Sequence, residues 1–151
     1  MNVEFINPFL LAAVKVMETM TFTEARPKKP YLKQDKEPKG DVTGIIGING
    51  QAEGSLAISF NHDCICHLVT NMFGEQVDTI NQDVKDAVGE LTNMISGDAR
   101  RQLAESGLSL QAGIPQVFSG PGHKVEHSGP AIAVPFETPG GEFTIEVSIA
   151  G

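Results

Sequence analysis

The spacing of the apolar residues changes at Asp41, and this change narrows the possible folds more than any other feature of the sequence. Before it, apolar side chains recur every three or four residues, as on one face of a helix: Phe9, Ala13, Val16, Met17 and Met20. After it, they alternate along two runs joined by Asn49-Gly50, a pair typical of a hairpin turn. Because a hairpin pairs its strands in opposite directions, we predict an α+β fold with mainly antiparallel pairing.

Three helices are predicted. The first begins at Asn7-Pro8, with Asn7 as the cap and Pro8 in the first helical position. The second covers 61–73 and is stopped by Gly74, and the third and longest covers about 82–105. These lengths are sufficient for helices that pack on a sheet.

Strands are also expected outside the hairpin. Short alternating runs predict strands at 116–119, 131–136 and 143–149, the last two joined through a turn at 139–141. Residues 21–40 are broken by three prolines, which favours an edge strand and a solvated loop over a central strand. We therefore expect a mainly antiparallel sheet with long helices packed on it.

Length and charge restrict the class of protein. A chain of 151 residues with 40% hydrophobic content can bury one core, so we expect a single domain over 1–151. The net charge is −8, and the segment 26–39 carries six basic and two acidic residues, so the remainder is more acidic still. An acidic surface argues against a nucleic-acid partner, because phosphate backbones are bound chiefly by lysine and arginine.

The cysteines and the apolar runs indicate a cytoplasmic protein. Cys64 and Cys66 are separated by one residue and offer no disulfide framework for a secreted domain. The apolar run 5–17 contains Pro8 and Lys15, lacks the basic start of a signal peptide and is too short to span a bilayer. We therefore expect no membrane insertion.

Four residues of the second helix suggest a metal site at first sight: His62, Cys64, Cys66 and His67. On a helix the two cysteines point about 200° apart and cannot share an ion. His62 with Cys66, or Cys64 with His67, could supply two ligands, which is short of the usual tetrahedral zinc site. We interpret them as residues that flank the core, and His123 and His127 as loop residues among glycines and prolines.

The long helix carries a polar patch opposite its apolar face. Asp86, Glu90, Asn93 and Gly97 fall within roughly 60° of arc. They oppose an apolar face of Val84, Ala87, Val88, Leu91, Met94 and Ile95. Asp86 and Glu90 repel at i, i+4 without a basic neighbour for Glu90, and Gly97 costs about 1 kcal/mol in a helix interior. The patch is either an ordinary solvated helix face or a surface meant for a partner.

The spacing of this patch resembles a family signature. The elements are Asp86, three residues, Glu90, two residues, Asn93, and Pro115 after twenty-one more. This spacing is similar to that of the CheX, CheC and FliY phosphatases of bacterial chemotaxis, and the string at 89–97 is close to their catalytic helix. The strings at 47–60 and 71–74 resemble CheX in particular, so the resemblance covers nearly the whole chain.

The resemblance implies a CheC-like fold with an internal pseudo-repeat and a phosphatase that hydrolyses the aspartyl phosphate of a CheY-like response regulator. Glu90 and Asn93 would be catalytic: the Asn93 amide would align water, and Glu90 would pair with the regulator's phosphate-site lysine. Asp86 and Gly97 would contact the partner. The family resemblance also implies no cofactor or metal in this chain, Mg²⁺ in the regulator, and a homodimer.

Two alternatives remain open. Glu90 could act as a general base, but an exposed carboxylate is a weak base at neutral pH, so we favour a docking role. The chain could also be a non-catalytic module that binds a regulator or a flagellar or receptor component through the same helix. An adaptor has no evident need for the Asn93 amide, which favours catalysis.

A second copy of the motif is suggested near the start of the chain. Glu4 and Asn7 repeat the Glu, two residues, Asn spacing found in the family members that carry two sites. Pro8 should disturb helical geometry there, and Leu11 stands at the place that matches Gly97. We therefore interpret Asn7 as a helix cap and the pair as a relic.

Overall fold

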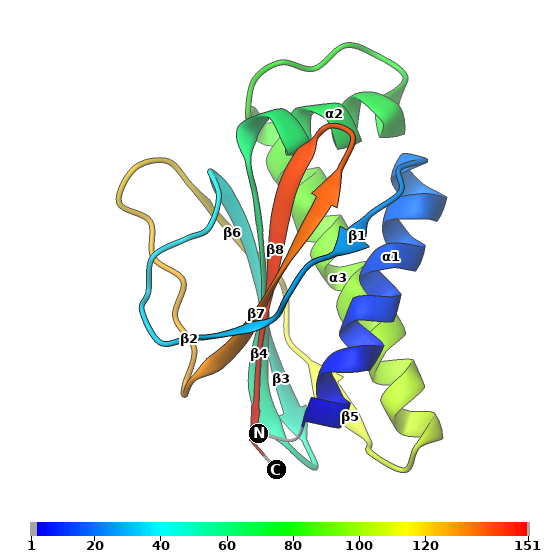
Figure 1. The fold of residues 1–151 in the computed structure, drawn as a ribbon, viewed down its shortest axis with the longest axis vertical. Coiled ribbons are helices and arrows are strands. Elements are labelled where there is room, and N and C mark those ends of the chain that lie inside the picture. The colour runs from blue at the N-terminus through cyan, green and yellow to red at the C-terminus, as the bar shows by residue number, and fades with distance from the viewer. Residues whose placement is uncertain (1–2, 151) are drawn as a thin grey trace.

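Helices cover one face of a curved antiparallel sheet in the computed structural model, which describes residues 3–150 (Figure 1). The helical elements are η1 (Val3–Phe5), α1 (Ile6–Thr21), α2 (His62–Phe73) and α3 (Gln82–Glu105). The strands are β1 (Arg26–Pro27), β2 (Tyr31–Lys33), β3 (Val42–Gly50), β4 (Glu53–Phe60), β5 (Leu110–Ala112), β6 (Gln116–Ser119), β7 (Ala131–Thr138) and β8 (Gly141–Ala150). The predicted α+β class is confirmed.

The sheet is built from nested hairpins. Its order is β1-β7-β8-β4-β3-β5, while β2 also pairs with β7 and β6 also pairs with β3, and every pairing is antiparallel. The short strands β1 and β2 lie along β7 at one edge, as the prolines of that segment predicted. The predicted hairpin is confirmed, with Val42 opposite Phe60 and Ile48 opposite Gly54.

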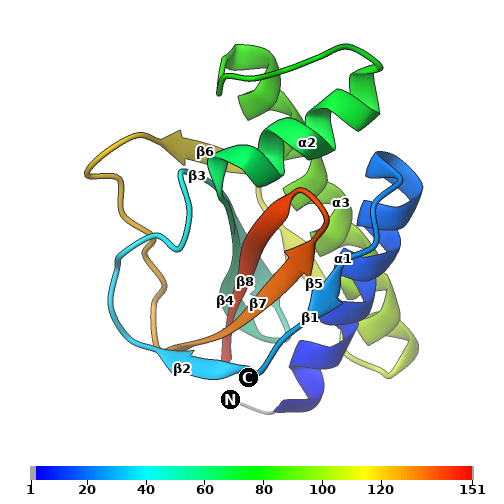
Figure 2. The same ribbon diagram turned by 45° about the horizontal axis from the view of Figure 1, so that its top comes forward.

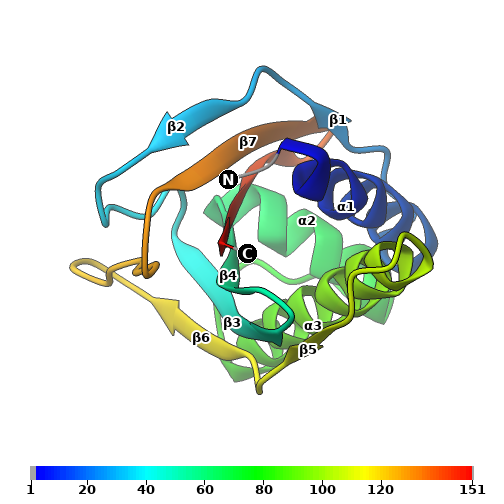
Figure 3. The ribbon, with the colours of Figure 1, turned by 90° about the horizontal axis from the view of Figure 1, so that it is seen from below.

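One hydrophobic core lies between the sheet and the helices. Alternate residues of the central strands point into it, among them Ile46, Leu56, Ile58, Ile145 and Val147, all at most 1% exposed. The helices add their apolar faces to the same cluster. Figures 1 and 3 show α1 and α3 running side by side in opposite directions on this face, and Figure 2 shows α2 across one end.

A glycine lets α3 pack directly on the sheet. Gly44 of β3 lies under α3, and a Cβ at this position would overlap the side chain of Thr92. Thr92 is fully buried, and its hydroxyl donates to the carbonyl oxygen of Val88 at 2.7 Å. The close contact holds α3 in one rotation about its axis, which decides which of its residues face solvent.

The opposite face of the sheet carries a buried polar network that the sequence did not predict. The Glu146 carboxylate of β8 is fully buried and lies 3.3 Å from Lys33 Nζ and 3.1 Å from His127 Nε2. His127 Nδ1 lies 2.5 Å from Ser55 Oγ. Lys33 lies in the segment predicted to form an edge strand and a solvated loop, yet its side chain is 1% exposed. The network attaches β2 and the 120–130 loop to the sheet, away from the helices (Figure 1).

The predicted start of the first helix was wrong. α1 begins at Ile6, so Asn7 is helical, and Phe5 occupies the cap position without a side-chain cap hydrogen bond. Pro8 is the third residue of α1 and is tolerated there, because backbone N–H groups of a first turn have no acceptor within the helix. The structure also contains β5, which was not predicted.

The helices of residues 3–150 are not suited to crossing a bilayer. None of them combines the length and the apolar content that a membrane span requires.

Candidate functional site on α3

The helix that carries the predicted site begins and ends where the sequence predicted. Asn81 caps α3, its side-chain oxygen accepting the backbone N–H of Val84 at 3.0 Å. The residues predicted for the apolar face are buried, except that Met94 is only partly buried. Thr92 and Ser96 are buried as well, so the covered side of α3 is wider than predicted.

Glu90 and Asn93 project into solvent from the outer side of α3. Both residues are exposed, and they lie one helical turn apart. Neither side chain makes a hydrogen bond or an ion pair with any other residue between 3 and 150. The carboxylate and the carboxamide are therefore free to bind groups of another molecule.

Asp86 and Gly97 extend this patch in both directions along the helix. The exposed Asp86 carboxylate accepts a hydrogen bond from the side-chain amide of Gln82 at 2.8 Å. Gly97 is half-buried, and a Cβ added there would meet only Arg100 Nη2 at 3.8 Å, an ordinary contact. The structure thus brings all four predicted residues onto one helix face, with Asp86 already engaged by a neighbour.

Pro115 lies at the edge of the sheet beside α3. It is half-buried in the segment between β5 and β6, where the N–H of Gly113 donates to the carbonyl oxygen of Gly47 at 3.0 Å. Both strands contact α3, and Figure 3 shows them next to it. The proline of the signature therefore lies between two strands that contact the helix carrying the other three residues.

Glu4 and Asn7 are both exposed. The prediction that Pro8 disturbs the helical geometry at Asn7 was wrong. Asn7 is in α1 rather than at its cap, so Pro8 has not displaced it from helical geometry. Glu4 lies in η1. Leu11 is 62% exposed at the place that corresponds to Gly97, so a leucine side chain stands beside Asn7 where the matching position beside Asn93 has none. That this pair is inactive stays a prediction.

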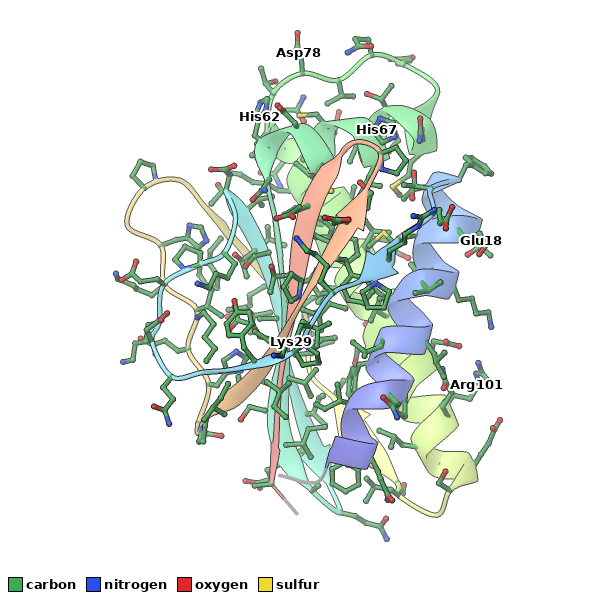
Figure 4. The ribbon with its side chains drawn as sticks, viewed as in Figure 1. Glu18, Lys29, His62, His67, Asp78 and Arg101 are labelled. Carbon is green, nitrogen blue, oxygen red and sulfur yellow. The ribbon has the colours of Figure 1, made fainter. Side chains whose placement is uncertain are left out.

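The histidines and cysteines of α2 lie apart from the site, at the end of the sheet that α2 covers (Figures 1 and 4). Burial raises the pKa of the Cys64 thiol to about 11, which makes it a poor nucleophile at neutral pH. A hydrogen bond with Asp63 raises the pKa of His62, whose Nε2 lies 3.0 Å from the carbonyl oxygen of Asp78. In residues 3–150 no three His, Cys, Asp or Glu side chains are grouped to hold a metal ion.

Asp98, next to Gly97, links α3 to α1. Its side chain is only 13% exposed, contacts Arg101 closely, accepts from Gln102 Nε2 at 3.1 Å and lies 3.6 Å from Lys15 Nζ. Burial alone raises the pKa of the Asp98 carboxyl, but the hydrogen bonds from Arg101 and Gln102 and the charge of Lys15 outweigh it. The net result is a pKa below the usual value.

The lowered pKa of Asp98 predicts a stability difference that depends on pH. A carboxyl whose pKa falls on folding stabilises the native state above its unfolded pKa of about 3.9 and loses this contribution as the pH drops through the folded pKa. We expect Asp98→Asn to lower the free energy of unfolding at pH 7 and to have a smaller effect at pH 3. Urea denaturation of both proteins at both pH values measures the difference in their free energies of unfolding. An equal difference at pH 7 and at pH 3 contradicts the account.

Comparison with known proteins gives consistent matches across the chain. Residues 42–137 match the family model of the chemotaxis phosphatase CheX. The CheY-P phosphatase CheX of Thermotoga maritima is 26% identical over 136 residues, which cover 89% of this chain and 88% of that protein. The crystal structure of a CheC-like superfamily protein from Shewanella sp. PV-4 is 42% identical with a TM-score of 0.92, and each chain is fully covered. The CheX–CheY–BeF3–Mg²⁺ complex from Borrelia burgdorferi is 28% identical with a TM-score of 0.82, covering 99% of this chain and 100% of that one.

Proposed function

Because the chain belongs to the CheX family of chemotaxis phosphatases, we propose that it removes the phosphoryl group from the aspartyl phosphate of a CheY-like response regulator. The observation that carries the proposal is the exposure of Glu90 and Asn93 together on one fixed face of α3. The reaction serves chemotaxis or a related two-component pathway in the cytoplasm.

Asn93 orients the attacking water. Its side-chain carbonyl accepts a hydrogen bond from the water, while its NH₂ donates to an oxygen of the phosphoryl group. Water attacks phosphorus in line with the bond to the regulator's aspartate, that P–O bond breaks, and the carboxylate leaves with the bonding electrons while inorganic phosphate carries away the elements of water. A carboxylate is a good leaving group, so positioning is the main requirement.

Glu90 fixes the position of the regulator. The carboxylate pairs with the lysine ammonium beside the regulator's phosphorylation site, one helical turn from the Asn93 amide. Asp86, farther along the same face, contributes negative charge to the docking surface. The two roles are complementary, because Glu90 sets the register in which Asn93 reaches the acyl phosphate.

The metal ion of the reaction belongs to the regulator in this proposal. A related CheX was crystallised in a complex that contains CheY, BeF3 and Mg²⁺. When bound beside the aspartyl phosphate, Mg²⁺ neutralises charge on the phosphoryl oxygens. This chain supplies the amide and the docking carboxylate, needs no cofactor of its own, and acts as a homodimer, as the family resemblance suggests.

Phosphate release from a phosphorylated regulator tests the proposal. A CheY-type regulator from the same organism is charged with acetyl phosphate, and phosphate release is followed with and without this chain. We expect at least about tenfold acceleration over the regulator's own hydrolysis. Binding without acceleration would instead identify a non-catalytic regulator-binding module, and neither binding nor acceleration would reject this class of partner.

A further inference from the structure

A groove between α1 and α3 is continuous with the proposed site. It encloses about 310 Å³, and its lining includes Lys15 and Val16 of α1 and Met94, Gly97, Asp98 and Arg101 of α3. Gly97 lies one helical turn beyond Asn93 on the same face. Arg101 is seen at the outer side of the helix pair in Figure 4. The groove therefore adds α1 to the surface that a bound partner would cover.

No contact among residues 3–150 explains why position 97 lacks a side chain. A Cβ at Gly97 would make only an ordinary contact with Arg100, whereas a Cβ at Gly44 would overlap Thr92. Glycine is unfavourable in a helix interior, so a glycine without an internal reason indicates close approach by another molecule. Here the close approach is to the backbone of α3 beside Asn93.

The groove is formed without a partner, because Asp98 ties its two walls together. The carboxylate lies between Lys15 on α1 and Arg101 on α3. Both cations pair with Asp98, and Arg101 Nη1 also lies 3.5 Å from Glu105 Oε1, yet the two side chains remain 62% and 56% exposed at the rim. Val16 is 4% exposed and Met94 is partly buried, which gives the groove an apolar floor.

A regulator docked for catalysis would lie over this groove. A partner that brings an acyl phosphate to Asn93 also covers Gly97, which is about 6 Å farther along the helix axis. A Mg²⁺-binding phosphorylation site is surrounded by carboxylates, and these complement Lys15 and Arg101. The α3 face has Glu90 at one end and the cations Lys15 and Arg101 beyond Gly97, and this difference in charge favours one docking orientation.

We propose that the groove between α1 and α3 receives a main-chain segment of the response regulator next to its phosphorylation site. An apolar side chain of that segment rests on Val16 and Met94, and a carboxylate of the same segment accepts from the solvent-facing N–H groups of Lys15 and Arg101 that Asp98 does not use. The proposal rests on the proposed function and makes α1 part of the docking surface. Since the groove touches none of the reacting atoms, it determines KM and not kcat.

Filling the groove tests the proposal. We expect Gly97→Leu to raise the Kd for a CheY-type regulator loaded with BeF3 and Mg²⁺ by about tenfold, and to raise KM similarly, with kcat within about twofold of wild type. Lys15→Ala should raise both by about threefold, and its effect should shrink at high salt. Ala104→Leu adds the same side chain at an exposed position two turns beyond Gly97, and it should leave Kd and KM unchanged.

Stability and oligomeric state separate the possible outcomes. Gly97→Ala serves if the leucine variant does not fold, and it should raise the melting temperature while weakening regulator binding. An unchanged Kd in the Gly97 variants overturns the proposal. A sedimentation coefficient that differs between the Gly97 variants and wild type, each without regulator, also overturns it, because it would indicate that a second copy of this chain occupies the groove. Failure of the proposed function is distinguishable, because it would appear as absent catalysis in the wild-type protein.

Discussion

Asn93→Ala is expected to lower kcat for phosphate release by at least about a hundredfold while leaving the Kd for the regulator within about threefold. The exposed amide makes no hydrogen bond within residues 3–150, so we expect its removal to leave the packing of α3 unchanged. What is lost is the alignment of water with the phosphoryl group, which is needed only in the transition state. Stopped-flow phosphate release and binding of the BeF3-loaded regulator measure the two quantities separately.

Asn7→Ala is the matched control for this experiment. It removes the same amide from an exposed position on α1, preceded by a glutamate at the same spacing. We expect wild-type kcat, because the leucine side chain of Leu11 stands beside Asn7, where Gly97 leaves the surface beside Asn93 open. Equal rates for Asn93→Ala and wild type would contradict the catalytic role, and a loss of rate in Asn7→Ala would show that the first motif is active.

Lys33→Met should be the most destabilising of these substitutions, at about 3–5 kcal/mol in the free energy of unfolding. The ammonium lies 3.3 Å from the Glu146 carboxylate, and each side chain is only 1% exposed. Without Lys33, the buried carboxylate keeps only the contact with His127, and its second oxygen already lacks a partner among the described residues. Urea denaturation should show a lower midpoint with an unchanged m-value.

Two further variants distinguish charge burial from a general packing defect. Lys28→Met removes a lysine that bridges Glu137 and Glu142 at the exposed edge of the same sheet, and it should change the midpoint little. Adding Glu146→Gln to Lys33→Met should restore most of the loss, because the buried charge is then gone. If the double variant is no more stable than the single one, the electrostatic explanation is wrong. The kcat of folded Lys33→Met should be normal, because this network lies on the face of the sheet away from α3.

The arrangement of the candidate site could be predicted from the sequence because it depends on one helix. Residues 82–105 carry a periodic apolar face, and helical geometry alone places Glu90, Asn93 and Gly97 on the opposite side. The helix ends agree with the structure because the pattern is long and strongly periodic. The roles of Glu90 and Asn93 came from the family spacing and not from periodicity, which is equally compatible with a solvated face.

What could not be predicted depends on contacts between distant segments. Lys33 follows prolines in a basic stretch, and only the pairing of β2 with β7 brings it to Glu146. The three residues of β5 have too short a pattern to be recognised without their partner strand β3. Asn7 was misassigned because Asn-Pro is a local signal, and proline is tolerated throughout a first helical turn. The groove beside Gly97 required the packing of α1 on α3.

The most direct measurement is a crystal structure of this chain bound to a CheY-type regulator that carries BeF3 and Mg²⁺. The account predicts the Asn93 amide within about 3 Å of the fluoride or of a water in line with beryllium, and Glu90 paired with the regulator's lysine. A regulator bound to the other face of the sheet, or a complex that leaves Asn93 in solvent, would contradict it.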